Sequence, residues 1–168
     1  MIEVLIAISV VMVAMLAAVS TLTSTAILGQ SNDETTIATQ GARSAMEVLR
    51  GLDFQSILPS YNSDPNDDPG GVGTAPGIHF EVPGLSVQDG DTDGFVGRVL
   101  LPFDASESLV ENLDLPQYGM PRDLNGDGSI DGIDHSSDHI ILPVLIVVEW
   151  TGRTGNRRIE FSTIVGQG

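Results

Sequence analysis

The stretch MIEVLIAISVVMVAMLAAVS, residues 1–20, is almost entirely apolar and carries one carboxylate, Glu3, close to its beginning. From residue 4 to residue 22 the only polar side chains are Ser9, Ser20 and Thr21. A helix of about 20 apolar residues covers a hydrocarbon core of roughly 30 Å. Because the apolar side chains occur all around the helix, the stretch is suited to burial in lipid or in a bundle of similar helices.

Two simple interpretations of this segment leave Glu3 unexplained. Secretory signals begin with a positively charged region. The only early charge here is negative, although residues 18–20 (AVS) could serve as a cleavage site. A plain membrane anchor has no use for a carboxylate near the edge of the span, where the charge is costly and usually has a specific partner.

The helical pattern continues beyond the apolar run. In residues 31–53, SNDETTIATQGARSAMEVLRGLD, apolar and small residues recur at three- and four-residue spacing and so form one face of a helix. They are Ile37, Gly41, Ala45, Val48, Leu49 and Leu52. We therefore predict one helix over residues 1–53, apolar all round in its first half and one-sided in its second. Gly51 and then Pro59 are expected to mark its end.

The motif Ile2-Glu3-Val4-Leu5-Ile6-Ala7, followed by a long helix of this kind, resembles the type IV pilins and the pseudopilins of type II secretion. The resemblance implies that a dedicated peptidase removes a short leader and methylates the new amino terminus, after which the helices pack into a filament core. It also implies that Glu3 neutralises the amino-terminal ammonium of a neighbouring subunit. Family members usually carry phenylalanine and one further residue ahead of the position of Met1, so the spacing between the terminus and Glu3 stays open.

Residues 54–168 are predicted to form a small globular head. A stretch of turn residues from 60 to 77 is followed by strand candidates at 78–82, 95–101, 140–150 and 157–165, of which the last two alternate most clearly. The segment TGRTGN, residues 151–156, indicates a hairpin connection, and Pro143 should make the start of its strand irregular or an edge. The expected fold class is α+β, with a long N-terminal helix and an antiparallel sheet.

The composition excludes some functions. The 168 residues carry 23 acidic and 7 basic side chains, all of the latter arginine, for a formal net charge of −16. Nucleic acid is not an expected partner, since no basic stripe is available to replace the counterions of phosphate. No cysteine is present, so disulfides and thiolate metal sites are excluded.

Residues 123–134, DLNGDGSIDGID, follow the pattern of a calcium loop. Alternate oxygen ligands around a glycine turn can surround one hard cation, and the loose geometry that calcium accepts favours calcium over magnesium. The candidate ligands at positions one, three, five, seven, nine and twelve are Asp123, Asn125, Asp127, Ser129 (through its carbonyl), Asp131 and Asp134. Position twelve is usually glutamate, and in having aspartate there the loop resembles those of dockerin modules.

Three other interpretations of the acidic segments remain open. Residues 123–134 could form a solvated turn without metal, and residues 89–94 (DGDTDG) repeat only the first half of the pattern, which favours a surface turn over a second site. His135, Asp138 and His139 form an H-x-x-D-H string, but a zinc site of that type needs a helix to bring both imidazoles to one face.

We expect a non-enzymatic structural subunit of a type IV pilus-like or pseudopilus filament, built from copies of this chain or mixed with other pilins. The resemblance implies passage through the bacterial inner membrane, contact with the prepilin peptidase and the assembly machinery, and a final place in an extracellular filament or a periplasmic pseudopilus. The alternatives are a membrane-tethered, calcium-dependent adhesion or docking module that does not polymerise, and a tethered hydrolase that uses His135 and His139.

Overall fold

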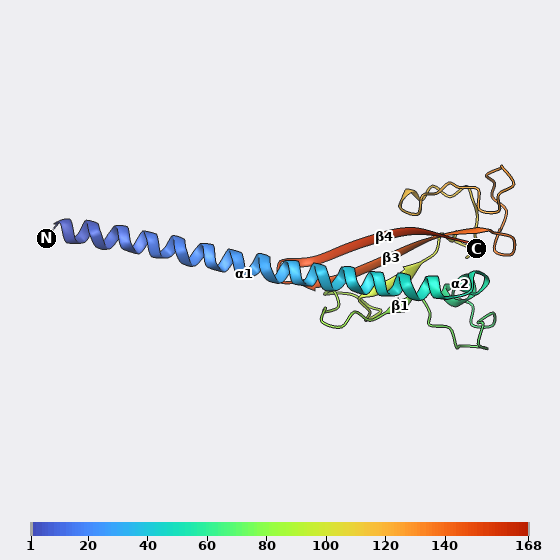
Figure 1. Cartoon of the computed structure of the whole chain (residues 1–168), viewed down its shortest axis with the longest axis horizontal. Coiled ribbons are helices and arrows are strands. Elements are labelled where there is room, and N and C mark those ends of the chain that lie inside the picture. Colours follow the sequence, from blue (N-terminus) through green and yellow to red (C-terminus); the bar gives the residue numbers. More distant parts are fainter. Residues whose placement is uncertain (1, 168) are drawn as a thin grey trace.

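The computed structural model describes residues 2–167, and one helix dominates it (Figure 1). Helix α1 runs without interruption from Ile2 to Gly51, a span of 50 residues. At a rise of about 1.5 Å per residue, such a helix is about 75 Å long. Its first half extends away from the rest of the chain, and its second half lies against an antiparallel sheet. The chain therefore has the α+β fold that its sequence predicts.

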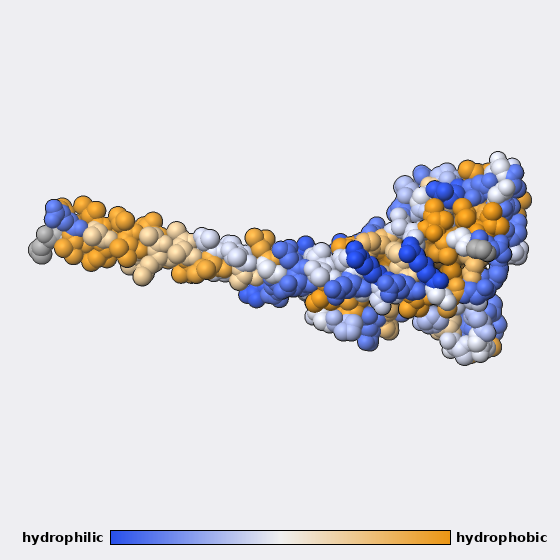
Figure 2. Space-filling view, viewed as in Figure 1, coloured by the Kyte–Doolittle hydropathy of each residue, from blue (hydrophilic) through white to orange (hydrophobic). Residues whose placement is uncertain are grey.

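The first half of α1 exposes its apolar side chains. Ile2 is 74% exposed and Leu22 71% exposed, and the most apolar 18-residue window, with a mean hydropathy of 2.7, has none of its residues buried. Figure 2 shows this part of the helix as an almost continuous apolar surface. By length and composition the helix could cross a membrane, either as an anchor or as a signal sequence.

The second half of α1 is part of the core of the head. Ala38, Ala42 and Leu49 are fully buried, and this half of the helix contacts mainly the long third strand of the sheet. The buried face is centred on Ala38 and Ala42, which the predicted face did not include, whereas Val48 is 55% exposed. The helix packs close to the sheet through these small alanine side chains. Its buried face is therefore less hydrophobic than its exposed first half, which carries larger apolar side chains.

The sheet has four strands in the order β1-β2-β3-β4, with every neighbouring pair antiparallel. The strands are β1 (His79–Phe80), β2 (Gly97–Leu100), β3 (Ile141–Gly152) and β4 (Gly155–Gly166). The predicted hairpin is confirmed, with Gly152 paired to Gly155 across a two-residue turn. Pro143 lies in β3 before Leu145, where pairing with β2 begins, so β3 is paired only to β4 at that residue.

Two sides of β3 are covered. Residues 142–148 of this strand are all buried, which requires contacts on both faces of the sheet. In Figure 1, α1 lies on one side, and the irregular segment of about residues 101–140, which includes the short helix η1 (Pro116–Tyr118), lies on the other. Leu109, Met120 and Leu124 of that segment join the same core as Ala38 and Ala42. Core side chains before and within the acidic loop thus anchor that loop to the head.

A second helix, α2 (Phe54–Tyr61), follows α1 after a short bend. Helix α1 ends at Gly51 as predicted, whereas Pro59, the second expected end marker, lies inside α2. The side chains of Phe54, Ile57 and Leu58 are buried against the head. The free energy gained from this burial offsets the loss of the backbone hydrogen bond that proline cannot donate.

Helix α1 approaches the head very closely at Gly41. A methyl group added at this position would come within 2.7 Å of both γ carbons of Val82, which is 4% exposed. We predict that Gly41→Ala lowers the stability of the head by about 1–3 kcal/mol through overpacking. Thermal unfolding of the detergent-solubilised chain, followed by fluorescence of Trp150, the single tryptophan and a buried one, measures the change.

Gly51→Ala is the matched control, because a methyl group there meets no atom within 4 Å. This variant should stay within about 0.5 kcal/mol of the parent chain. Equal unfolding temperatures for the two variants would contradict the close packing of α1 against Val82.

Candidate metal site in the acidic loop

The first half of the loop at residues 123–134 curls around one carboxylate. The two carboxylate oxygens of Asp123 accept N–H hydrogen bonds from Gly126 at 2.6 Å and from Gly128 at 2.9 Å. Gly128 has φ +88°, a conformation that favours glycine, at the position where the predicted pattern needs its sharp turn. The backbone is therefore folded back on Asp123.

Asn125 and Asp127 continue this curl. Oδ1 of Asn125 accepts the N–H of Asp127 at 3.0 Å, and Oδ1 of Asp127 accepts the N–H of Ser129 at 2.7 Å. The oxygens of these side chains keep further lone pairs available. Asp127 and Ser129 are also exposed. Residues 123–129 thus supply several hard oxygen donors on one short, turned segment, as a calcium ion requires.

The second half of the loop divides its two acidic residues. Oδ1 of Asp131 accepts the N–H of Ile133 at 2.8 Å and lies 3.3 Å from Nε2 of His135. Oδ1 of Asp134 accepts N–H bonds from Leu109 at 3.1 Å and from Ser136 at 3.0 Å. These bonds fasten Asp134, the predicted ligand at position twelve, to Leu109 and Ser136 through one of its two carboxylate oxygens.

Glu111, the most deeply buried acidic residue of this region, is not among the ligands that the sequence pattern predicts. It is 1% exposed, and its Oε1 accepts the N–H of Leu124 at 2.6 Å. Its Oε2 accepts the N–H of Asp131 at 3.3 Å. Glu111 stands in the sequence SLVENLD, which has no metal-ligand spacing and no periodicity, so only the apolar pair before it, Leu109 and Val110, indicates burial.

His135 lies beside this buried carboxylate. Its Nε2 is 3.8 Å from Oε2 of Glu111, and its Nδ1 is 3.0 Å from Oδ1 of Asp138. Burial alone would lower the pKa of His135, but the hydrogen bonds with Asp138 and Asp131 and the charge of Glu111 raise it above its usual value. A protonated His135 can therefore neutralise part of the negative charge beneath the loop.

The H-x-x-D-H string does not bring its two imidazoles to one metal position. Nδ1 of His139 lies 3.1 Å from the carbonyl oxygen of His135, and the His139 ring packs 5.1 Å from the ring of Phe54. Nε2 of His139 is buried without a hydrogen-bond partner in the described part of the chain, and desolvation by burial lowers the pKa of this side chain. His139 thus belongs to the core next to α2.

Within residues 2–167, one group of three acidic or histidine side chains has its ligand atoms within 4.8 Å of one another: Glu111, Asp131 and His135. This group could hold a metal ion, and Asp131 belongs both to it and to the predicted calcium ligands. The carboxylates and the imidazole do not by themselves identify the metal, since zinc accepts both ligand types, whereas the oxygen-rich first half of the loop suits calcium.

The half-pattern at residues 89–94 is engaged in holding the sheet. The carboxylate of Asp93 lies 3.5 Å from Nη1 of Arg98 and 3.4 Å from Nε2 of His79, and it accepts the N–H of Phe95 at 2.8 Å. Asp93, one of the three aspartates in this segment, therefore pairs with a side chain of β1 and with one of β2.

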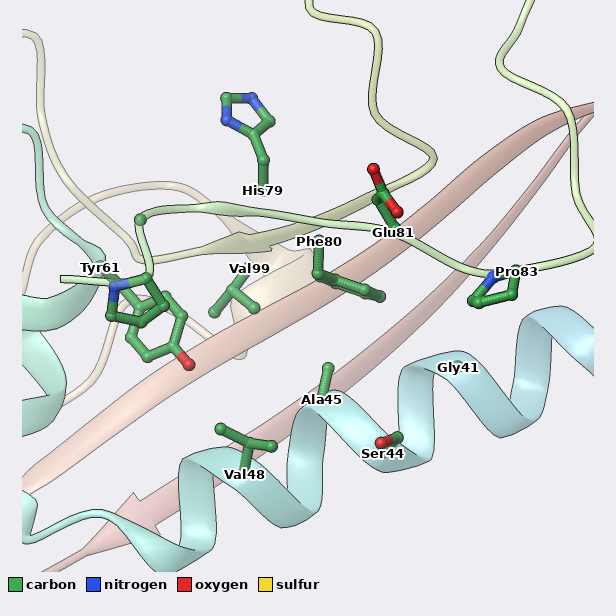
Figure 3. Close-up of a pocket in the computed structure, with 12 residues that line it drawn as sticks. Gly41, Ser44, Ala45, Val48, Tyr61, His79, Phe80, Glu81, Pro83 and Val99 are labelled. Carbon is green, nitrogen blue, oxygen red and sulfur yellow. The ribbon is translucent and has the colours of Figure 1, made fainter. Parts of the chain in front are cut away.

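Outside the acidic loop, the head has an apolar groove of about 280 Å³ between α1 and the β1 segment. Phe80 and Val99 of the sheet and Ala45 of α1 point into it, whereas His79 and Glu81 point away (Figure 3). The lining is mostly apolar, so the groove suits an apolar group better than a charged one.

Comparison of the chain with models of known families, with curated proteins and with solved structures found no match.

The two halves of the loop should respond differently to substitution when metal is absent. We predict that Asp134→Ala lowers the unfolding free energy by about 1 kcal/mol in the presence of a chelator, because it removes the acceptor for Leu109 and Ser136. Asp127→Ala removes only the exposed bond to Ser129. This second variant should stay within about 0.5 kcal/mol of the parent chain. Urea unfolding followed by Trp150 fluorescence compares them, and equal losses would contradict the different roles of the two residues.

Proposed function

We propose that the chain is a structural subunit of a filament of the type IV pilin or pseudopilin kind, in which the first half of α1 forms the filament core and the head faces outward. The observation that supports this most is the continuity of α1. One unbroken helix has an exposed apolar half and a half that is built into the head. Such a helix fixes the position of the head relative to the exposed half.

The apolar half is suited to burial among other helices. The hydroxyl groups of Ser9, Thr21, Thr23, Ser24 and Thr25 donate to carbonyl oxygens four residues earlier in α1. These hydroxyls therefore need no outside partner once the helix leaves water. Glu3 is different, because its carboxylate has no ion-pair partner within residues 2–167 and is exposed.

The proposal gives Glu3 a partner in the next subunit. A buried carboxylate costs several kcal/mol unless an opposite charge accompanies it, and the amino-terminal ammonium of a neighbouring helix supplies that charge. The pairing would favour one register between adjacent helices. Before assembly the subunit would sit in the bacterial inner membrane and meet the prepilin peptidase and the assembly machinery. After assembly it would belong to an extracellular filament or a periplasmic pseudopilus.

We further propose that the acidic loop binds one calcium ion. Asp123, Asn125, Asp127, the Ser129 carbonyl, Asp131 and Asp134 would provide oxygen ligands, and the curl of residues 123–129 supports the use of its donors together. The ion would supply positive charge to residues 104–138, which contain nine acidic residues and one arginine. It would stabilise the exposed part of the head, which would have to persist outside the cell.

The filament proposal is tested by Glu3→Gln, which removes the charge and keeps the size. We expect this variant to insert into the membrane normally but to enter filaments much less often than the parent chain, because the neighbouring ammonium loses its counterion. Glu47→Gln is the control, since Glu47 is an exposed carboxylate on the head half of the same helix. Immunogold labelling of sheared filaments, together with the amount of inserted subunit, gives the comparison.

Equal incorporation of the Glu3 variant and the control would refute the assembly role of Glu3. If the parent chain itself inserted stably but never appeared in fibres, the membrane-tethered adhesion module would be the better description.

The calcium proposal is tested on the full chain in detergent, because the buried face of α1 belongs to the core of the head and a fragment starting at Asp53 would lack it. Native mass spectrometry should show one bound calcium, and calcium should raise the unfolding temperature, since a ligand that binds only the folded state stabilises it. Zinc and magnesium at equal concentration should raise it less. Identical unfolding with calcium and with chelator would exclude a calcium role, and a preference for zinc would favour the Glu111, Asp131 and His135 group instead.

A further inference from the structure

Glu111 lies outside the loop at residues 123–134 but contacts both of its ends. Its Oε1 accepts the N–H of Leu124 at 2.6 Å and that of Asn125 at 3.3 Å, both at the start of the loop. Its Oε2 accepts the N–H of Asp131 at 3.3 Å, near the end of the loop. One side chain therefore connects the start of the loop to its later part, and a bound cation would need both parts close together.

The backbone around Glu111 reinforces the same connection. Its carbonyl oxygen accepts the N–H of Arg122 at 3.0 Å, and the N–H of the next residue, Asn112, donates to the carbonyl oxygen of Asp131 at 3.1 Å. The carbonyl oxygen of Leu109, two residues earlier, accepts the N–H of His135 at 2.8 Å. The segment 109–112 is thus hydrogen-bonded to both arms of the loop, which are residues 122–125 and residues 131–135.

The carboxylate of Glu111, which is 1% exposed, needs compensation for its burial. Burial of an unpaired carboxylate costs several kcal/mol. The backbone N–H groups and His135, whose Nε2 lies 3.8 Å from Oε2 of Glu111, offset that cost only while both arms stay in position. Glu111 and the two parts of the loop that it binds therefore stabilise one another.

We propose that Glu111 is a positioning residue that holds the acidic loop in its cation-binding shape before the cation arrives. The inference rests on the proposed calcium binding and concerns how that site is built. Glu111 fixes the backbone just after Asp123 and at Asp131, so the ligand oxygens start close to their bound arrangement. Calcium then has less chain to order, and less of its binding free energy is lost to ordering.

This role also explains how a loop with aspartate at position twelve can close. Oδ1 of Asp134 is engaged by Leu109 and Ser136, so the loop is fastened at that end to the same 109–112 segment. Glu111 supplies a second fastening through Asp131. The closure that a long glutamate at position twelve provides by itself is here divided between two shorter connections.

The test compares calcium affinities of the full chain in detergent by isothermal titration calorimetry. Glu111→Gln should raise the Kd for calcium about tenfold or more, the usual effect of removing a group that orients metal ligands. Glu107→Gln is the matched control, since it removes the same charge from an exposed position in the same segment. Screening by solvent and salt should keep its effect on the Kd below about threefold.

A second measurement does not depend on the folding of any variant. In the parent chain with chelator, hydrogen exchange should already be slow at the amides of Leu124 and Asp131, because Glu111 binds them without metal. If these amides exchanged as fast as those of an unfolded peptide until calcium was added, the positioning role would be overturned.

The outcomes separate this inference from the proposal on which it rests. A parent chain that binds no calcium would end both. A parent chain that binds calcium, with an unchanged Kd in the Glu111 variant, would overturn the positioning role alone, even if that variant unfolded at a lower temperature.

Discussion

The head of this protein can cover only one half of its own long helix. Ala38, Ala42 and Leu49 are buried against the sheet, and residues 142–148 of β3 are fully enclosed between α1 and the segment on the opposite face. Within the described chain, no equivalent surface covers residues 2–22, whose apolar side chains remain exposed. Since exposed apolar area on this scale is unfavourable in water, we expect lipid or other helices to cover it. The membrane stage and the filament stage of the proposed function are two ways to satisfy this single requirement.

The rigidity of α1 connects that requirement to the head. The helix has no break between Ile2 and Gly51, and its contacts continue to the tip of the hairpin, where Arg157 is bonded to Ser31 and lies over the ring of Trp150. Glu34 accepts a hydrogen bond from the indole of Trp150 at 3.4 Å. The orientation of the head relative to the exposed helix is therefore fixed by packing and by polar contacts at the point where the two meet.

The acidic loop poses the opposite physical problem, an excess of charge rather than of apolar surface. Contacts within the chain balance part of this charge, because backbone N–H groups bind Asp123, Asp131, Asp134 and Glu111, and His135 lies among three carboxylates. The carboxylate of Asp127 stays exposed, with one oxygen bonded to the N–H of Ser129. A divalent cation would complete the neutralisation, and the buried attachment of the loop through Leu109 and Leu124 would carry its effect into the core.

Local patterns in the sequence predicted the long helix, the two long strands and the turn at Gly128, because each depends on residues close together in the chain. The predicted centre of the buried helix face was wrong, because the sequence does not distinguish the buried Ala38 and Ala42 from alanines on an exposed helix face. Glu111 was missed because its partners lie 13 to 20 residues away and no spacing rule connects them. The hydrogen bond from Leu109 to Asp134 could not be predicted either, because only the fold brings Leu109 to that position.

The most direct measurement is a helical reconstruction of the native filament by electron cryomicroscopy, at a resolution that shows side chains. The proposed function predicts that residues 2–28 of neighbouring subunits pack together along the axis, with the Glu3 carboxylate within ion-pair distance of an adjacent amino terminus and the acidic loop on the outer surface. A filament whose core excludes these residues, or one in which Glu3 faces no cation, would contradict it.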